Sequence, residues 1–195
     1  TKVANAVSEK CMEGAAIPPI AKSMLKMNEG CRYAHDKEYE MACDCFQKAL
    51  MMQENIVPTP VPQITDTCRN LGMAYYYNGQ YNEAVTYLNR ALDYHAASTD
   101  ENNMAEIIEL YELLAYCDYY KKNEESAAEQ FRKVAKMHES LNGRLSSGVA
   151  KCMRMQGRCL YCVKQYDEAW NLMNRALDIA MQKWDYMRKP FSFWK

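Results

Sequence analysis

The sequence has little glycine or proline, no excess of either charge and no long apolar run. Seven Gly and six Pro in 195 residues lie mostly between segments, which favours helices joined by short turns. The 24 Lys and Arg residues nearly balance the 25 Asp and Glu residues, so the positive field with which nucleic-acid-binding proteins neutralise phosphates is missing. No stretch approaches the roughly 20 apolar residues of a membrane span. We therefore expect neither a nucleic-acid partner nor membrane insertion.

Enzyme motifs are also missing. There are three His residues, and the sequence contains no His-x-x-x-His pair, glycine-rich phosphate loop or nucleophile elbow. The strongest candidate for chemistry is the pair Cys159 and Cys162, which follows Cys152. A zinc site needs further ligands at matching spacing, and a redox pair usually lies at a helix N-terminus, whereas this pair falls in mid-helix. We interpret these cysteines as small buried apolar residues and expect no catalytic residue, metal or cofactor.

The cysteines bear on the cellular compartment. Nine of them, an odd number, are spread through the predicted helices, which favours free thiols in a reducing environment over a disulfide framework. Residues 1–20 lack the apolar core of a signal peptide. We expect an intracellular and most simply cytoplasmic location; an organelle matrix, reached after removal of a targeting segment, stays open.

An internal repeat recurs four times. The segments align without a gap from Gly30, Gly72, Ala115 and Gly157, at spacings of 42 or 43 residues. Twelve residues after each start stands an alanine, and a large apolar residue and a second small residue follow at fixed intervals. These three sets are Ala42, Ala84, Ala127 and Ala169; Phe46, Leu88, Phe131 and Met173; and Ala49, Ala91, Val134 and Ala176. Small residues let two helices approach while the large one fills the remaining space, so each unit is predicted to be a helical hairpin.

This small-large-small signature resembles the tetratricopeptide-repeat family from about Ser23 to Ala180. The spacing is similar to the longer repeats of kinesin light chains and Pins-type adaptors. The resemblance implies an all-α fold, a right-handed superhelical stack of about four hairpins with N- and C-terminal capping segments. We place the repeats at about 21–55, 63–97, 104–141 and 149–183, a capping helix within 1–20, and an aromatic tail at 184–195. Between the first two repeats, Pro58, Pro60 and Pro62 favour an extended linker, with a helix starting near Asp66.

The resemblance also implies a concave side, lined by the first helix of each repeat, where ligands bind. The inward positions of each first helix are found by counting from the small residue of the repeat. Asn28 and Asn70 fall where kinesin-light-chain-like repeats often carry an Asn that bonds a ligand backbone. The predicted partner-binding residues are Asn28, Arg69, Asn70, Met73, Tyr76, Tyr77, Glu109, Glu112, Tyr116, Tyr119, Tyr120, Lys151, Arg154, Arg158 and Tyr161. In the tail, Trp184, Phe191, Phe193 and Trp194 either cover the last repeat or contact a partner.

Two features stand out within this set. Tyr76, Tyr119 and Tyr161 share one register, which predicts a ladder of amphipathic rings suited to holding a peptide. Acidic residues in the third repeat and basic residues in the fourth predict a segregated charge pattern that a partner would complement. The alternative is that the rings only pack between repeats and the charges are only solvated. The carboxylate clamp of chaperone-binding family members is missing, because Met27 and Cys31 stand at its Lys and Asn positions.

The function predicted from these patterns is a protein-interaction scaffold or adaptor. It would bind a peptide or a partner subunit in the concave groove, as a member of a multiprotein complex, and it would act by binding alone. Two alternatives are a regulatory domain of a larger protein and a thiol or metal enzyme that uses Cys159 and Cys162.

Overall fold

The computed structural model describes residues 17–97 and 103–188, and in the last helix it describes side chains up to residue 182. These residues form eight helices and no strand, which confirms the predicted all-α fold. The helices are α2 (Pro19–His35), α3 (Tyr39–Glu54), α4 (Val61–Tyr77), α5 (Tyr81–Ala97), α6 (Met104–Tyr120), α7 (Glu124–Asn142), α8 (Ser147–Cys162) and α9 (Tyr166–Arg188). Within the described ranges, no helix is both long and apolar enough to cross a bilayer.

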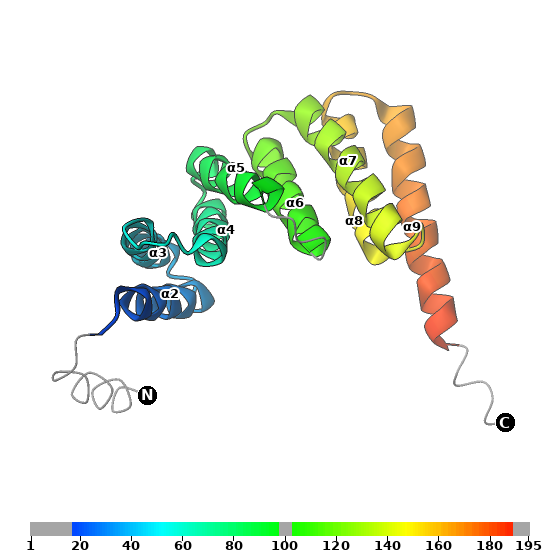
Figure 1. The fold of residues 1–195 in the computed structure, drawn as a ribbon. Helices are drawn as coiled ribbons and strands as arrows, with labels where there is room; N and C mark the ends of the chain where they lie inside the picture. The colour runs from blue at the N-terminus through cyan, green and yellow to red at the C-terminus, as the bar shows by residue number, and fades with distance from the viewer. Residues whose placement is uncertain (1–16, 98–102, 189–195) are drawn as a thin grey trace. The chain divides into compact units, whose positions relative to one another are not determined.

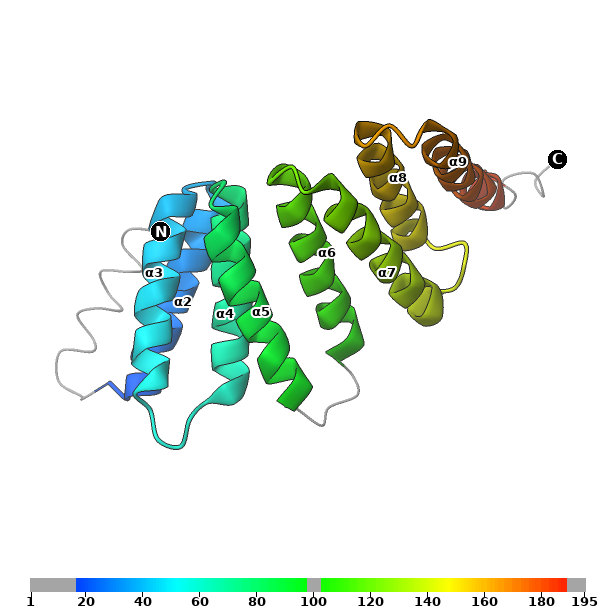
Figure 2. The ribbon, with the colours of Figure 1, turned by 90° about the horizontal axis from the view of Figure 1, so that it is seen from above.

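The chain divides into two compact units, which we describe separately. Unit 1 contains α2, α3 and α4, and unit 2 contains α5 to α9. In unit 1, α3 packs against both α2 and α4 (Figure 1). In unit 2, each helix packs against the next one along the chain, as the pair α8 and α9 shows (Figure 2). Each unit is therefore built from neighbouring helices in sequence order, as in a helical repeat.

The helix starts show one correction to the sequence reading. α4 begins at Val61, five residues before the predicted start near Asp66. Pro62 lies in the first turn of α4, where its missing N–H has no partner to lose and its fixed φ suits the helix. The linker therefore ends before Pro62, although the three prolines suggested that it continues beyond this residue. At α8, Ser146 caps the helix by accepting a hydrogen bond from the Val149 N–H at 3.3 Å.

The turn between the two helices of a repeat has the same backbone geometry in all four. The residue with positive φ is Lys37 (64°), Gly79 (80°), Lys122 (64°) or Lys164 (65°), and each lies seven residues after the small residue of its repeat. In the first repeat, the Lys37 and Glu38 N–H groups bond back to the carbonyls of Ala34 and Tyr33. This pattern ends an α-helix with a left-handed residue.

The small-large-small residues form the core of the hairpins, as the sequence predicts. In unit 1, Ala42, Phe46 and Ala49 are buried, and a Cβ added to Gly30 would lie 2.6 Å from Cε1 of the Phe46 ring. In unit 2, one cluster comprises Ala115, Ala127, Ala128, Phe131, Met155, Cys159, Leu160 and Ala169. This cluster joins α6 and α7 to α8 and α9, so the third and fourth repeats share one core.

Some predicted elements fall outside the described residues. Most of the capping helix within 1–20 and three tail aromatics, Phe191, Phe193 and Trp194, lie there. α9 continues to Arg188, so the boundary that the sequence suggested at 184 falls within a helix. Trp184 lies on this helix, and its side chain is outside the described part.

Candidate functional site

All fifteen predicted partner-binding residues reach the surface of their units. None is buried: eight are exposed and seven are half-buried. The exposed ones are Asn28, Tyr77, Glu109, Tyr120, Lys151, Arg154, Arg158 and Tyr161, and the half-buried ones are Arg69, Asn70, Met73, Tyr76, Glu112, Tyr116 and Tyr119. The surroundings of these side chains differ between the units, and their role in binding a partner stays a prediction.

In unit 1, three of these residues line one cavity of about 370 Å³, which we call the α2–α4 cavity. Its walls are Cys31, Ala34, Tyr39, Phe46, Asn70, Met73, Ala74 and Tyr77. Cys31 and Met73 hold the same position of the first helix in two successive repeats. Asn28, the other predicted asparagine, is exposed and does not line this cavity. The cavity therefore lies where predicted inward positions of adjacent repeats meet.

The aromatic wall of the α2–α4 cavity is held by contacts between rings, whereas the side chain of its polar residue, Asn70, makes no hydrogen bond within the described residues. Tyr77 stacks on Tyr39, with ring centroids 5.3 Å apart and planes 20° from parallel, and Tyr76 meets the Tyr77 ring edge-on at 5.1 Å. Asn70 makes no side-chain hydrogen bond to any residue within 17–97 or 103–188. Its amide can therefore donate to and accept from a guest, beside an aromatic wall that neighbouring rings hold in place.

In unit 2, the predicted aromatic residues contact side chains of a neighbouring repeat. Tyr120 stacks on Tyr81 with centroids 5.4 Å apart, in the same way that Tyr77 stacks on Tyr39 in unit 1. Nη2 of Arg158 donates to Tyr119 Oη at 3.1 Å, and its guanidinium lies 5.5 Å from the centre of that ring. Packing therefore accounts for one face of these tyrosines. Tyr161 is 62% exposed and offers the most free ring surface of the predicted ladder.

One acidic and one basic residue that the sequence assigns to separate patches pair with each other in unit 2. Lys151 on α8 donates to Glu112 Oε2 on α6 at 2.5 Å, and its ammonium lies 5.5 Å from the centre of the Tyr116 ring. Burial lowers the pKa of Lys151, but the hydrogen bond and charge of Glu112 outweigh it and hold the pKa above its ordinary value. These two predicted partner contacts therefore neutralise each other across adjacent repeats.

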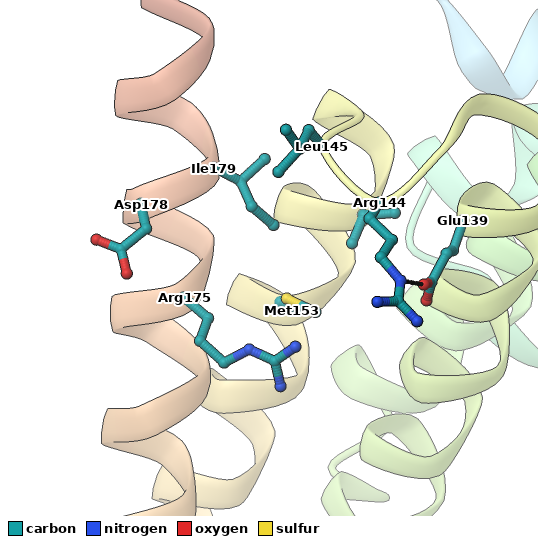
Figure 3. A pocket seen from close by; sticks show the side chains of 8 residues that line it. Glu139, Arg144, Leu145, Met153, Arg175, Asp178 and Ile179 are labelled. Carbon is teal, nitrogen blue, oxygen red and sulfur yellow. Dashed lines mark hydrogen bonds and ion pairs between the residues drawn. The ribbon is translucent and has the colours of Figure 1, made fainter.

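A second cavity of about 440 Å³ lies where the end of α7 meets α8 and α9 (Figure 3). Its walls are Glu139, Arg144, Leu145, Val149, Met153, Arg175, Asp178 and Ile179. Arg144 Nε bonds Glu139 at 2.5 Å, and Figure 3 shows Arg175 extending from α9 toward α8. Its two arginines and two carboxylates give it no net charge, so it does not indicate one class of ligand.

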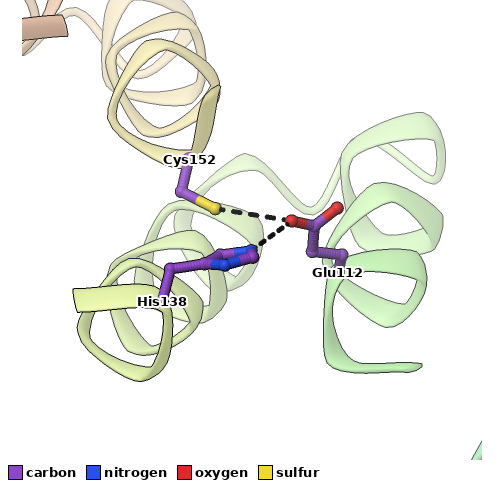
Figure 4. A group of neighbouring side chains, drawn as sticks. All are labelled: Glu112, His138 and Cys152. Atoms are coloured by element: carbon purple, nitrogen blue, oxygen red, sulfur yellow. Dashed lines mark hydrogen bonds and ion pairs between the residues drawn. The ribbon is translucent and has the colours of Figure 1, made fainter. Parts of the chain in front are cut away.

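The structure brings together a group that the sequence analysis did not find: Glu112, His138 and Cys152 (Figure 4). One repeat position in the sequence could have indicated this group. Gln53, His95 and His138 occupy one position of successive second helices, and each contacts a neighbouring first helix. Thr67 Oγ1 donates to Gln53 at 2.8 Å, and His95 lies 3.5 Å from Glu106. A polar residue that recurs at a buried position indicates a polar contact between helices.

The two members of the cysteine pair that the sequence raised as a candidate for chemistry lie in different surroundings. Cys159 is fully buried, whereas Cys162 is exposed. Burial raises the pKa of Cys159 to about 11, and it raises the pKa of Cys43 and Cys117 to about 11 as well. Thiols act as nucleophiles in the thiolate form, and burial favours the protonated form of these three.

Comparison with known families and structures agrees with the repeat geometry. Residues 65–95 match the family model described as "Tetratricopeptide repeat". The chain carries a tetratricopeptide repeat. This match spans most of α4 and α5, the second of the four sequence repeats, and it confirms a tetratricopeptide repeat in that part of the chain. The search of curated proteins found no match to the sequence.

Three solved structures are similar in fold. The apo form of RapI aligns with a TM-score of 0.78 and 19% identity, over 92% of this chain and 48% of that one. Aspartyl phosphate phosphatase F from Bacillus subtilis aligns at 0.72 and 18%, over 90% and 44%. BtubC (BKLC) from P. vanneervenii aligns at 0.59 and 20%, over 84% and 72%. The chain thus spans less than half the length of RapI and of aspartyl phosphate phosphatase F, and at these identities the likeness concerns the fold alone.

Proposed function

We propose that the chain is a scaffold or adaptor that binds a segment of a partner protein on its first helices, by contact alone. The observation that carries this proposal is the α2–α4 cavity, where inward residues of two successive repeats surround about 370 Å³ of open space. Concave sites with mostly apolar walls and a few polar groups are the usual form of binding sites. A multiprotein complex in the cytoplasm is the setting we propose for such a scaffold.

The walls of the cavity suggest the chemistry of its guest. Met73, Cys31 and Ala34 offer an apolar surface for one side chain, and the flexible Met thioether adapts to different shapes. Asn70 lies beside them with an amide that can bond both the N–H and the C=O of a main chain. An extended peptide with one apolar anchor satisfies both features, since its main-chain groups need partners when they leave water.

Unit 2 offers a second contact surface of the same kind. Tyr161 exposes most of its ring, and Arg154 and Arg158 lie exposed on the same helix, α8. Tyrosine and arginine are enriched among the residues that dominate binding energy at interfaces. A longer partner could therefore contact each unit separately, which adds affinity without a single continuous site.

The test uses a peptide selected from a random display library on the immobilised chain. Its affinity is then measured by fluorescence anisotropy for Met73→Arg and for the control Met51→Arg, which puts the same substitution on an exposed methionine of α3 outside the cavity. The proposal predicts at least a tenfold loss for Met73→Arg and no change for Met51→Arg, with circular dichroism showing both folded. Equal affinities for the two variants, or a library that yields no binding peptide, would refute the proposal.

A further inference from the structure

Three metal-ligating side chains from three successive helices meet in unit 2. They are Glu112 on α6, His138 on α7 and Cys152 on α8, and one ligand atom of each lies within 4.8 Å of the others (Figure 4). His138 Nε2 is 2.7 Å from Glu112 Oε1, and Cys152 Sγ is 4.0 Å from the same oxygen. The Glu112 and His138 side chains are 13% and 16% exposed, and Cys152 is 1% exposed. This is a partly buried and chemically mixed group, not a cluster of acids on a surface.

The donor set matches one metal in particular. Thiolate, imidazole and carboxylate together suit Zn²⁺, which binds them at roughly 2.0–2.3 Å. In a tetrahedral site these bond lengths separate the ligand atoms by about 3.3–3.8 Å. The distances of 2.7 and 4.0 Å from Glu112 Oε1 lie on either side of that range, and the ligand atoms of His138 and Cys152 lie within 4.8 Å of each other. We infer that Glu112, His138 and Cys152 form a Zn²⁺ site that ties α6 and α7 to α8.

Neighbouring residues support the ligands. Lys151 holds Glu112 Oε2, which leaves Oε1 facing His138 and Cys152; ligating carboxylates commonly have such an outer partner. Gly148 makes room for the imidazole, because a Cβ at this position would lie 2.5 Å from His138 Nδ1. That buried nitrogen has no hydrogen-bond partner among the described residues. The His138 ring is therefore positioned by packing against Gly148 and by Glu112.

The site also has an open side. A cavity of about 650 Å³ is lined by Glu112, His138, Asn142, Leu145, Ser146, Ser147, Gly148 and Lys151. It gives the ion a route from solvent and leaves space for a water molecule as the fourth ligand, as in zinc sites with three protein ligands. Burial, and then the charge of Glu112, raise the pKa of the Cys152 thiol to about 12, so the ion has to displace this proton to solvent before the thiolate can bind it. The carboxylate and the thiolate carry two negative charges against the two positive charges of the ion, and Lys151 adds one more positive charge beside them.

The experiment uses Co²⁺ as a visible substitute for Zn²⁺, added to the reduced full chain. We expect one Co²⁺ per chain, a near-ultraviolet sulfur-to-cobalt charge-transfer band, and loss of that band when Zn²⁺ is added. Cys152→Ser should abolish the band, and Glu112→Gln and His138→Gln should each weaken metal binding more than tenfold. Cys162→Ser is the matched control: it is an exposed thiol on the same helix and should leave the band unchanged.

Two results would overturn the zinc site. One is the absence of a charge-transfer band in the wild-type chain, which would leave Glu112, His138 and Lys151 as a hydrogen-bonded ion-pair network only. The other is a band that survives in Cys152→Ser and disappears in Cys162→Ser, which would assign the metal to the pair Cys159 and Cys162. If Cys152→Ser does not fold by circular dichroism, the affinities of Glu112→Gln and His138→Gln decide. Neither result affects the proposed peptide site, which lies in unit 1.

Discussion

The Phe46 ring occupies the space beside Gly30 that any larger side chain at position 30 would need. A Cβ there would lie 2.6 Å from Cε1 of the ring. The same relationship recurs in the fourth repeat, where a Cβ on Gly157 would lie 2.9 Å from Cγ of Met173 and 3.1 Å from the Ala169 carbonyl oxygen. A small residue on the first helix and a large one on the second therefore fix how closely the helices of a repeat pack.

Gly30→Ala should destabilise the chain even though alanine favours helix formation. The added methyl group forces Phe46 to move within a packed core, and such overpacking costs about 1–3 kcal/mol. Asn28→Ala on the same helix is the control, since Asn28 is exposed, and it should change stability by less than about 0.5 kcal/mol. Urea unfolding followed by circular dichroism measures both. If Gly30→Ala is as stable as Asn28→Ala, the close contact with Phe46 is not a steric limit.

The turns make a prediction of the opposite sign. Lys122 and Lys164 adopt positive φ, which costs residues with a side chain about 1–2 kcal/mol per residue, whereas glycine adopts it freely. Lys122→Gly and Lys164→Gly should each stabilise unit 2 by about 0.5–1 kcal/mol, after part of the gain is lost to a more flexible unfolded chain. Thermal unfolding measures the effect.

A neighbouring lysine provides the control for these turns. Lys121 has φ of −75°, so Lys121→Gly removes no strain and should lower stability or leave it unchanged. Gly79→Ala, at the equivalent turn of the second repeat, should lower stability by about 1 kcal/mol. If glycine has the same effect at 121 and at 122, backbone strain is not the cause.

Much of the fold could be predicted from local spacing. The small and large residues of each repeat recur in register, and their steric roles depend only on the two helices of one hairpin, so Gly30 and Phe46 could be identified without a structure. The turn geometry was harder to see, because glycine marks it only at Gly79 and lysine stands in the other three repeats. The start of α4 was predicted wrongly because Pro62 was taken to belong to the linker, although proline fits the first turn of a helix.

The candidate sites show where sequence reasoning stops. The register correctly identified residues that reach the surface, but it gave no information about which side chains of adjacent repeats bond to each other. Glu112 and Lys151 were predicted as separate contacts for a partner, yet they pair across two repeats. Cys152 was considered with Cys159 because the two are near in sequence, whereas its neighbours in space are Glu112 and His138. Such pairings depend on how one hairpin stacks on the next.

The buried thiols predict how stability depends on pH. The pKa of Cys117 is raised by burial to about 11 in the folded chain, against about 8.5 in an unfolded chain. Below pH 8.5 both states hold the proton; above it the unfolded chain loses the proton first, so stability falls as the pH rises toward 11. Cys117→Ala should make this fall smaller, as measured by urea unfolding between pH 7.5 and 11.

The control for this prediction removes buried volume without removing a thiol. Leu114 is buried on the same helix. Leu114→Ala should lower the free energy of unfolding by an amount that does not change with pH between 7.5 and 11. A pH slope that is the same in Cys117→Ala and in the wild-type chain would show that the Cys117 thiol does not contribute to it.

Methyl resonances of the fourteen methionines test the proposed binding surface most directly. The chain is labelled with ¹³C in its methionine methyl groups, and a display-selected peptide is added to saturation. Because Met73 lines the α2–α4 cavity while Met51 is exposed on α3 away from it, the Met73 resonance should shift and the Met51 resonance should not. A saturable shift at Met51, with Met73 unchanged, would contradict binding on the inward face of the first helices.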